Sequence, residues 1–373
     1  MSTIFLLSHV PIPRFIKRIE IANKKTNTTV IYWNRKNVNE TQYTLPQEVH
    51  IKRINLKAPQ GKPLLRIFPL IFFVIISLLN LIRMKPKTIH VGNIDMLMIS
   101  VIYKRIFNKN VNIIYEIGDL PNFIINKPSS RFKKVIKKYF IRIEKQLCLN
   151  INTLILTSPF FWENYYSEFI PKFKYLLILN VPKSTTFKNF VKKDRNYKEL
   201  TIGFIGSIRY KEQIKMLIDA TNELENVKVI IAGSGRDTEY IKNYIKDKKN
   251  VFYMGPYNFE KDAANLYSDI DCIYSVYNTK LNNVRLAYPN KLYEAIICNL
   301  PIIVSKDTEL ANFVSHNNIG FAVDDNDVFE LQSLINKIEK NRDILVPVSK
   351  SINEIQENYV YEIYEKKIFS LYS

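Results

Sequence analysis

Short apolar runs alternate with helical patterns along the whole chain, and this alternation restricts the fold more than any other feature. Runs such as TLILT and PIIVS carry no charge, as is typical of strands buried on both faces of a parallel sheet. The pattern predicts an α/β fold in which helices cover both faces of parallel sheets. Thirteen runs are predicted strands: 2–8, 28–33, 49–54, 88–92, 111–116, 153–157, 176–179, 200–206, 227–232, 250–254, 270–276, 301–304 and 319–322.

A polar, basic stretch, KSTTFKNFVKKDRNYKE, follows the seventh predicted strand and divides the strands into two groups. We therefore predict two facing, doubly wound, Rossmann-like domains at 1–185 and 200–351, joined by a linker at 186–199. A helix rich in Tyr and Ile is expected over 352–371, within a C-terminal segment at 352–373 that packs back on the N-terminal domain. A length of 373 residues suits two to three domains.

Positive charge is concentrated in the first half of the chain. The 54 basic and 35 acidic residues give a net charge of +19, but residues 1–200 carry +23 and the remainder carries −4. A half-molecule this basic is expected to meet a polyanion, either a nucleic acid or an anionic membrane surface. We favour the membrane, because no nucleic-acid-binding motif is visible and long aliphatic runs separate the basic residues. A nucleic-acid-binding protein is the alternative.

Two predicted helices support the choice of a membrane. Residues 131–145 carry seven basic side chains and one acidic one among apolar residues at helical spacing, a pattern typical of helices that lie on a membrane surface. Residues 67–82 are uncharged, but as a helix they would reach about 24 Å, less than the hydrocarbon core of about 30 Å. We expect a core helix whose exposed apolar face dips into lipid. A marginal transmembrane helix and a fully buried helix beside a solvated basic face are the alternatives.

The cysteines and histidines indicate neither a disulfide scaffold nor a metal site. Cys148, Cys272 and Cys298 form no CxxC pair, which favours a reducing compartment. The four histidines are too dispersed for a metal motif. The first apolar run is expected to be a strand, not a signal peptide. We therefore expect a cytoplasmic protein, peripherally associated with the inner face of the cell membrane, that binds no metal or cofactor.

Glycines are rare in this chain and gather where predicted strands end. Of the nine glycines, Gly206, Gly233, Gly235 and Gly255 directly follow strand runs of the second half. At such turns the backbone bends sharply or approaches a ligand closely. Because ligands of doubly wound sheets lie beyond the carboxyl ends of the strands, these turns are predicted to line a binding site.

Two stretches provide the charges that a diphosphate requires. Ser207, Arg209 and Lys211 follow a glycine turn and lead into a helix, where a diphosphate can bind; a surface loop with exposed cations is the alternative. In PNKLYEA, Lys291 lies in the first turn of a helix, where the helix dipole disfavours a cation unless a phosphate is bound. Glu294, one turn later, can accept two hydrogen bonds from a ribose, or can simply pair with Lys291 in solvent.

The order and spacing of five segments resemble the donor half of a GT-B glycosyltransferase of family 4, the kind that builds bacterial surface polysaccharides. The segments are GFIGSIR, VIIAGSG, VFYMGPY, LYSDIDCIYSVY and PNKLYEAIICNLPIIVS. The first half resembles the acceptor domain more loosely, through KTIHVGNIDMLMIS, NIIYEIGDLP, LILTSPFF and LILNVP. The last helix looks like the one that crosses back onto the N-terminal domain in such enzymes.

The resemblance implies transfer of a sugar from a UDP- or GDP-linked donor, without a metal and with retention of anomeric configuration. Arg209, with Lys211 or Lys291, would hold the diphosphate and stabilise the leaving group. Glu294 would bind the ribose. The remaining donor-binding residues implied by the motifs are Gly206, Ser207, Gly233, Gly235, Tyr257 and Asn290.

The sequence departs from the family pattern at two positions. Leu286 stands where the family often has an acidic residue that contacts the donor sugar, so we name no donor sugar. The family's histidine after the fifth strand is missing from YEIGD; Glu116 or Asp119 could act there, and Asp119 is our candidate for a catalytic group. The alternative for Asp119 is a capping or turn residue. Asp269-Ile-Asp271 fits the DxD metal site of GT-A enzymes but stands at the start of a strand, so we assign no metal to it.

The acceptor side is expected at the carboxyl ends of the first, fourth and fifth strands, where His9, Arg14, His90, Asn93 and Glu116 lie. A buried, hydrogen-bonded strand-end residue is the alternative for His90. The expected function is transfer of a sugar to a lipid-linked oligosaccharide in the synthesis of a surface polysaccharide such as a capsule. An epimerase-like nucleotide-sugar enzyme on the same scaffold is the alternative enzyme.

Overall fold

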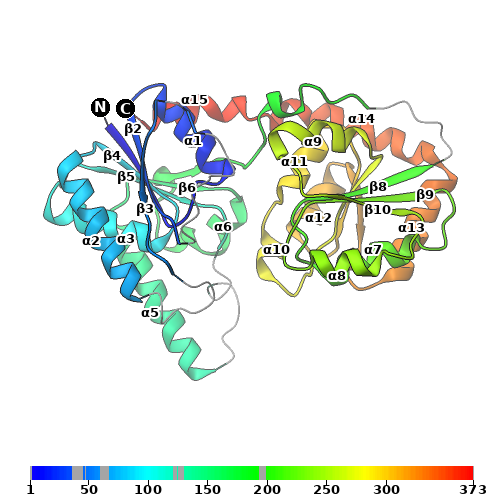
Figure 1. Ribbon diagram of the computed structural model, residues 1–373, viewed down its shortest axis with the longest axis horizontal. Coiled ribbons are helices and arrows are strands. Elements are labelled where there is room, and N and C mark those ends of the chain that lie inside the picture. The colour runs from blue at the N-terminus through cyan, green and yellow to red at the C-terminus, as the bar shows by residue number, and fades with distance from the viewer. Residues whose placement is uncertain are drawn as a thin grey trace. The chain divides into compact units, whose positions relative to one another are not determined.

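The computed structural model describes residues 2–35, 45–46, 48–58, 67–120, 124, 130–192 and 199–372. Within them, thirteen strands form two sheets, one in each of two compact units (Figure 1). Unit 1 contains the chain up to Leu179 together with the residues from Tyr364 onward, and unit 2 runs from Asn180 to Ile363. The thirteen predicted strands and the predicted α/β fold with two parallel sheets are confirmed.

Unit 1 contains a seven-stranded sheet in the order β3-β2-β1-β4-β5-β6-β7, and every neighbouring pair is parallel. Figure 1 shows α2, α3 and α5 on one side of this sheet and α1 on the other. The strand order reverses between β1 and β4, so their carboxyl ends mark the point where such sheets bind ligands. The elements are β1 (Ser2–Leu7), α1 (Pro13–Asn23), β2 (Asn27–Trp33), β3 (His50–Ile54), α2 (Ile67–Met84), β4 (Thr88–Val91), α3 (Ile94–Ile106), β5 (Asn112–Ile117), α5 (Arg131–Cys148), β6 (Thr153–Leu156), α6 (Pro159–Asn164) and β7 (Tyr175–Leu177).

Unit 2 contains a six-stranded parallel sheet in the order β10-β9-β8-β11-β12-β13. Figure 1 shows α7, α8 and α13 on one side of this sheet and α9 and α11 on the other. Its order reverses between β8 and β11. The elements are β8 (Leu200–Ile205), α7 (Lys211–Thr221), β9 (Val227–Ala232), α8 (Thr238–Tyr244), β10 (Val251–Gly255), α9 (Phe259–Ser268), β11 (Cys272–Ser275), α10 (Asn282–Leu286), α11 (Asn290–Ile297), β12 (Ile302–Ser305), α12 (Glu309–His316), β13 (Gly320–Val323), α13 (Val328–Lys340) and α14 (Leu345–Ile355).

The two ends of unit 2 differ from the predicted boundaries. The segment expected to begin a linker at residue 186 instead packs within the unit: the Thr186 hydroxyl donates to Glu260 at 3.0 Å, and the Phe187 ring lies against the Tyr267 ring. The prediction of one helix over 352–371 is wrong. Helix α14 ends at Ile355, a 3-10 turn follows, and α15 (Glu362–Ser370) begins anew.

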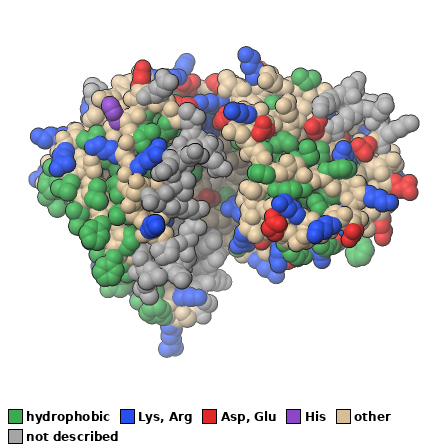
Figure 2. Space-filling view, viewed as in Figure 1, with side chains coloured by type: hydrophobic (Ala, Val, Ile, Leu, Met, Phe, Trp, Pro, Cys, Tyr) green, Lys and Arg blue, Asp and Glu red, His purple; other side chains and the backbone are tan. Residues whose placement is uncertain are grey.

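Helices α2 and α5 expose apolar side chains, as the sequence predicts. Phe68 and Phe72 of α2 are 74% and 57% exposed, and Phe132 and Tyr139 of α5 are 75% and 66% exposed. Figure 2 shows apolar side chains gathered over both helices, with basic side chains at the tip of α5. The predicted exposed apolar face is therefore confirmed for both helices. The expectation of a core helix over 67–82 is met only in part, because the buried residues of α2 are Phe73, Ser77 and Leu81, and full burial of α2 is excluded. Within the described residues, α2 is the one helix whose length and composition would allow it to cross a membrane, and these two properties alone do not show that it does.

Candidate functional site

Three turns of unit 2 meet backbone to backbone beyond the carboxyl ends of β8, β9 and β10. The Gly206 N–H donates to the Ala232 carbonyl at 2.8 Å, and the Gly233 N–H donates to the Gly255 carbonyl at 2.8 Å. A Cβ atom on Gly233 would stand 1.9 Å from the Gly206 carbonyl oxygen, and Gly233 has a φ of +133°. Only glycine fits at this position. The glycine turns that the sequence singled out therefore form one surface.

Lys291 extends from the first turn of α11 into this surface. The residue is buried, and its Nζ donates a 2.7 Å hydrogen bond to the Tyr277 hydroxyl. The same nitrogen lies 4.4 Å from the centre of the Phe204 ring and 3.0 Å from the position of a Cβ atom on Gly206. The structure thus brings together the glycine turn and the helix lysine that the sequence predicted as two parts of one site.

Arg209 is exposed and connects to Lys291 through two tyrosines. Its guanidinium lies 5.3 Å from the centre of the Tyr210 ring, and that ring lies 4.9 Å from the Tyr277 ring. Tyr277 in turn accepts the hydrogen bond from Lys291. Two cations therefore flank one aromatic pair at the carboxyl edge of β8 and β11, where a doubly wound sheet binds its ligand.

Glu294 lies one turn after Lys291 and is 5% exposed. One of its carboxylate oxygens accepts a short hydrogen bond from the Tyr267 hydroxyl. Burial, together with the negative charge of Glu294, raises the pKa of Tyr267 well above its ordinary value, so Tyr267 remains a donor to the carboxylate at neutral pH. Tyr257, also predicted for this site, is half-buried and lies close enough to Tyr267 to raise the same pKa further.

The other predicted donor-side residues occupy the rim of this surface. Lys211 is half-exposed and pairs with Glu212 at 3.7 Å, while Ser207 is exposed. The Gly235 N–H donates to Thr238 Oγ1 at 2.8 Å, which fixes the start of α8. Asn290 is exposed and accepts a 2.8 Å hydrogen bond from Asn180.

Sequence reasoning missed three aromatic residues that contact the predicted ones: Phe204, Tyr267 and Tyr277. Their signal was weak, because an aromatic residue in a strand or helix of an α/β protein is usually part of the core. Tyr277 was the easiest of the three to predict, since it lies two residues after β11, at the same edge of the sheet as the glycine turns.

A buried charged cluster lies at the equivalent edge of unit 1. Glu116 is 0% exposed, and its carboxylate is approached by Arg14 Nε at 3.1 Å, Arg18 Nε at 3.2 Å and His90 Nε2 at 3.1 Å. Burial alone would raise the pKa of Glu116, but Arg18, the His90 hydrogen bond and Arg14 outweigh it and hold the pKa well below the ordinary value. Glu116 is therefore ionised at neutral pH.

Two predicted acceptor-side residues do not reach the surface. His90 and Glu116 are both fully buried, so the expectation that they line the site is wrong in this conformation. His90 Nδ1 lies 2.8 Å from the Tyr372 hydroxyl, so both ring nitrogens have partners. Burial lowers the pKa of His90, which keeps the ring neutral. The alternative interpretation of His90 as a hydrogen-bonded strand-end residue is the one that holds.

The remaining acceptor-side candidates lie nearer the solvent. Asp119 is exposed. Burial lowers the pKa of Arg14, and the negative charges of Glu116 and Asp119 oppose that shift. Asn93 is exposed immediately before α3, and its side chain does not cap the helix. His9 is half-buried, with Nδ1 2.8 Å from the Val10 carbonyl oxygen.

The described residues contain no group of three His, Cys, Asp or Glu side chains that could hold a metal ion. Asp271 of the DxD sequence instead accepts the Thr201 N–H at 2.8 Å. The three cysteines are free and buried.

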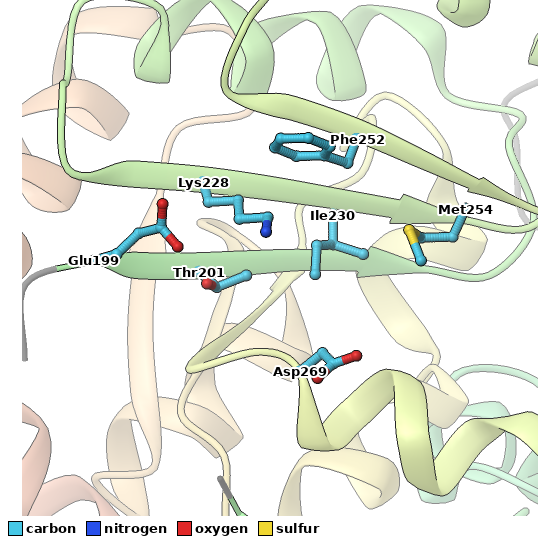
Figure 3. Close-up of a pocket in the computed structure, with 7 residues that line it drawn as sticks. All are labelled: Glu199, Thr201, Lys228, Ile230, Phe252, Met254 and Asp269. Atoms are coloured by element: carbon cyan, nitrogen blue, oxygen red, sulfur yellow. The ribbon is translucent and has the colours of Figure 1, made fainter. Parts of the chain in front are cut away.

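A pocket of about 430 Å³ lies on the face of the unit 2 sheet, apart from the predicted residues. Figure 3 shows side chains of β8, β9 and β10, among them Thr201, Lys228 and Phe252, around this pocket. Glu199 and Thr201 stand at the amino end of β8, so the pocket extends away from the edge that carries Lys291.

Comparison with known proteins gives a family match for the second half of the chain. Residues 185–358 match the family model of glycosyl transferases group 1. A curated relative, the succinoglycan biosynthesis protein ExoL of Rhizobium meliloti (strain 1021), is 22% identical over 275 residues. That alignment covers 69% of this chain and 65% of the relative, so it spans less than two thirds of the relative's length.

Two solved structures resemble the whole chain. Sucrose-phosphate synthase from Thermosynechococcus elongatus has a TM-score of 0.77 at 16% identity, with 100% of this chain and 98% of that chain covered. Anabaena HepE in complex with UDP has a TM-score of 0.71 at 14% identity, with 99% of each chain covered. These likenesses confirm the GT-B fold, and the family match indicates a glycosyl transferases group 1 domain over residues 185–358, in agreement with the predicted enzyme class.

Proposed function

We propose that this glycosyltransferase moves a sugar from a nucleotide-sugar to a lipid-linked saccharide in the synthesis of a cell-surface polysaccharide, by the metal-independent, retaining chemistry of family 4. Two relatives support the proposal by their printed names. One is named for succinoglycan biosynthesis, and HepE was solved with UDP and with UDP-glucose. A UDP-linked donor is therefore our first choice, with a GDP-linked donor second.

The contact between Lys291 and the turn at Gly206 carries the proposal. A buried ammonium group beside a backbone that has no side chain leaves room for a diphosphate to approach both the cation and the turn. Arg209, exposed on the same aromatic pair, supplies a second cation. In the departing nucleoside diphosphate, charge develops on the diphosphate oxygens, so Lys291 and Arg209 stabilise the transition state more than the ground state.

Glu294 fits the ribose of the nucleotide. Its carboxylate accepts a hydrogen bond from Tyr267, and a carboxylate can accept several hydrogen bonds, among which we propose those of the two ribose hydroxyls. Because the carboxylate is already ordered, its binding to the ribose costs less conformational entropy than ordering a mobile side chain would. On the acceptor side, exposed Asp119 is the group that would accept or orient the attacking hydroxyl.

The membrane is the proposed partner of unit 1, on the cytoplasmic face. Basic residues of α5 would meet anionic headgroups, and the exposed apolar side chains of α2 and α5 would enter the boundary of the hydrocarbon. A lipid-linked acceptor is held at such a surface by its own lipid, so the enzyme would meet its substrate there.

A nucleotide screen tests the proposal. The purified chain is incubated with UDP, GDP, CMP and ADP and with their common sugar conjugates, and the increase in Tm is measured. We expect UDP or its conjugates to raise Tm most, and turnover to persist in EDTA. Stabilisation by none of the nucleotides would refute the donor site, and a strict Mn²⁺ requirement would refute the metal-independent chemistry.

A further inference from the structure

Arg14 of α1 occupies the space in which a side chain on residue 118 would stand. A Cβ atom on Gly118 would lie 1.3 Å from Arg14 Nη1 and 2.3 Å from its Cζ. Gly118 directly follows β5, and Arg14 follows β1. The two residues therefore meet at the carboxyl edge of the unit 1 sheet, beside the point where the strand order reverses.

The guanidinium of Arg14 is held in place by a chain of buried groups. Glu116 Oε1 lies 3.1 Å from Arg14 Nε, and Glu116 Oε2 lies 3.1 Å from His90 Nε2. His90 Nδ1 lies 2.8 Å from the Tyr372 hydroxyl, so Tyr372 belongs to the same hydrogen-bonded network. Glu116, His90 and Tyr372 are all 0% exposed. Their positions fix the carboxylate against which Arg14 rests.

The two arginines of the cluster differ in what they can bind. Arg18 is fully buried and hydrogen-bonds to both oxygens of Glu116, at 3.2 and 3.4 Å. The side chain of Arg14 is 12% exposed. Its buried Nε makes the ion pair with Glu116, and within the described part of the chain Arg14 makes no side-chain hydrogen bond. Glu116 is thus already hydrogen-bonded by Arg18 and His90, and the Nη donors of Arg14 make no hydrogen bond within the described residues, so they can serve a ligand.

We propose that Arg14, seated on Gly118, binds an oxyanion carried by the acceptor. This inference rests on the proposed function, because it concerns the acceptor side of the same reaction. The planar fork of an arginine suits a phosphate or carboxylate group, which it can bind through two hydrogen bonds at once. The oxyanion is either the phosphate of a lipid carrier or the carboxylate of an acidic sugar. Exposed Asp119 lies beside it, in a position to meet an acceptor hydroxyl.

Binding to the full chain, with saturating UDP in the donor site, tests the inference. The probes are farnesyl phosphate, its neutral counterpart farnesol, and glucuronate. Arg14→Lys keeps the positive charge but removes the planar guanidinium. Gly118→Ala keeps Arg14 but displaces its guanidinium, because the new methyl group would occupy the same space. Arg105→Gln is the matched control, because Arg105 lies in the last turn of α3, which runs back from the carboxyl edge to the opposite edge of the sheet.

We expect the wild-type chain to bind farnesyl phosphate or glucuronate, and to bind farnesyl phosphate more tightly than farnesol. Both Arg14→Lys and Gly118→Ala should weaken anion binding at least tenfold. Arg105→Gln should bind the anions as tightly as the wild type, and the affinity for UDP should be the same in all variants. If farnesyl phosphate binding depends on Arg14, the anion is the phosphate of a lipid carrier. If glucuronate binding depends on Arg14, the anion is the carboxylate of an acidic sugar. Equal affinity of wild type and both variants for both anions would overturn the inference.

Tyr372→Phe tests the buried network separately, because it removes one hydroxyl far from the ligand. As a positioning residue, Tyr372 should affect the KM for acceptor and leave the KM for nucleotide-sugar unchanged, whereas a general loss of stability would change neither KM in the folded fraction. Wild-type turnover of a nucleotide-sugar with acceptor binding independent of Arg14 would refute this inference alone. Absence of any nucleotide binding would refute the proposed function instead.

Discussion

The ammonium nitrogen of Lys291 lies 3.0 Å from the point at which a Cβ atom on Gly206 would stand. These residues come from α11 and from the turn after β8, and they are 85 positions apart in the sequence. A cation within reach of a bare backbone turn is the arrangement that a diphosphate needs. The donor chemistry of the enzyme is expected to depend on this contact.

Replacing Lys291 by Ala should lower kcat by about 10²- to 10³-fold, which is typical for the loss of one group that stabilises charge in the transition state. Lys340→Ala, which removes an exposed lysine at the end of α13, is the control and should retain full activity. Steady-state kinetics with the donor identified by the nucleotide screen provides the measurement. Circular dichroism shows whether both variants remain folded. Wild-type turnover in Lys291→Ala would remove this lysine from the mechanism.

The ribose contact is tested by changing both partners: the protein in Glu294→Gln, and the substrate in donors that lack one ribose hydroxyl. The wild-type enzyme should bind a 2′-deoxy or 3′-deoxy donor about tenfold less tightly than the natural donor, because a hydrogen bond to a charged carboxylate is lost. In Glu294→Gln this discrimination should shrink, since the charged partner is already absent. The ratio of the two dissociation constants is measured for each protein by calorimetry. An unchanged ratio in the variant would place the ribose elsewhere.

A feature of this site could be predicted when a short stretch of sequence encodes it, and could not when it depends on a contact between residues far apart in the sequence. The strands, the glycine turns and the helix lysine could all be predicted, because each is encoded by a short run with its own periodicity or spacing. Arg14 and Arg18 are four residues apart on one helix, so the sequence places them on one face but does not show that both meet the carboxylate of Glu116, which is about one hundred positions away. The contact between Tyr372 and His90 had no local signal, because it joins residues 282 positions apart.

Burial was the property that sequence reasoning judged least well. His90 and Glu116 stand at strand ends, where a polar residue is as often a ligand as a structural group, and no local feature shows that Arg18 covers them. The boundaries of unit 2 failed for a related reason. Thr186 lies in a polar stretch that reads as a linker, and only its contact with distant Glu260 shows that it is packed.

Membrane association should depend on the basic face of α5 and weaken with salt. We expect flotation with vesicles of phosphatidylcholine and phosphatidylserine at low ionic strength and its loss as the salt concentration rises. A quadruple variant should reduce the partition coefficient by about three orders of magnitude, because each of the four cations contributes about 1 kcal/mol. Its changes are K133Q, K134Q, K137Q and K138Q. The control removes the same charge from exposed lysines of unit 2, through K246Q, K249Q, K337Q and K340Q. Equal flotation of both variants would remove α5 from the membrane contact.

Acid should destabilise the protein through Glu116. Its pKa in the folded protein is held well below the ordinary value of 4.5, so below about pH 4.5 the unfolded chain takes up a proton that the folded chain does not. The free energy of unfolding therefore falls as the pH drops below that value, and His90, whose pKa is lowered from 6.5 by burial, begins a similar loss at higher pH. Glu144, whose pKa burial raises, acts in the opposite direction.

Glu116→Gln isolates this contribution. At neutral pH the variant should lose about 3–5 kcal/mol, because Arg18 remains buried without its charged partner. Below pH 4.5, however, its stability should fall less steeply than that of the wild type, since no carboxylate remains at position 116 to take up a proton on unfolding. Urea midpoints at pH 7, 5 and 4 measure both effects, with exposed Glu163→Gln as the control that should follow the wild type. Parallel curves for wild type and Glu116→Gln would show that the buried cluster does not set the acid limit.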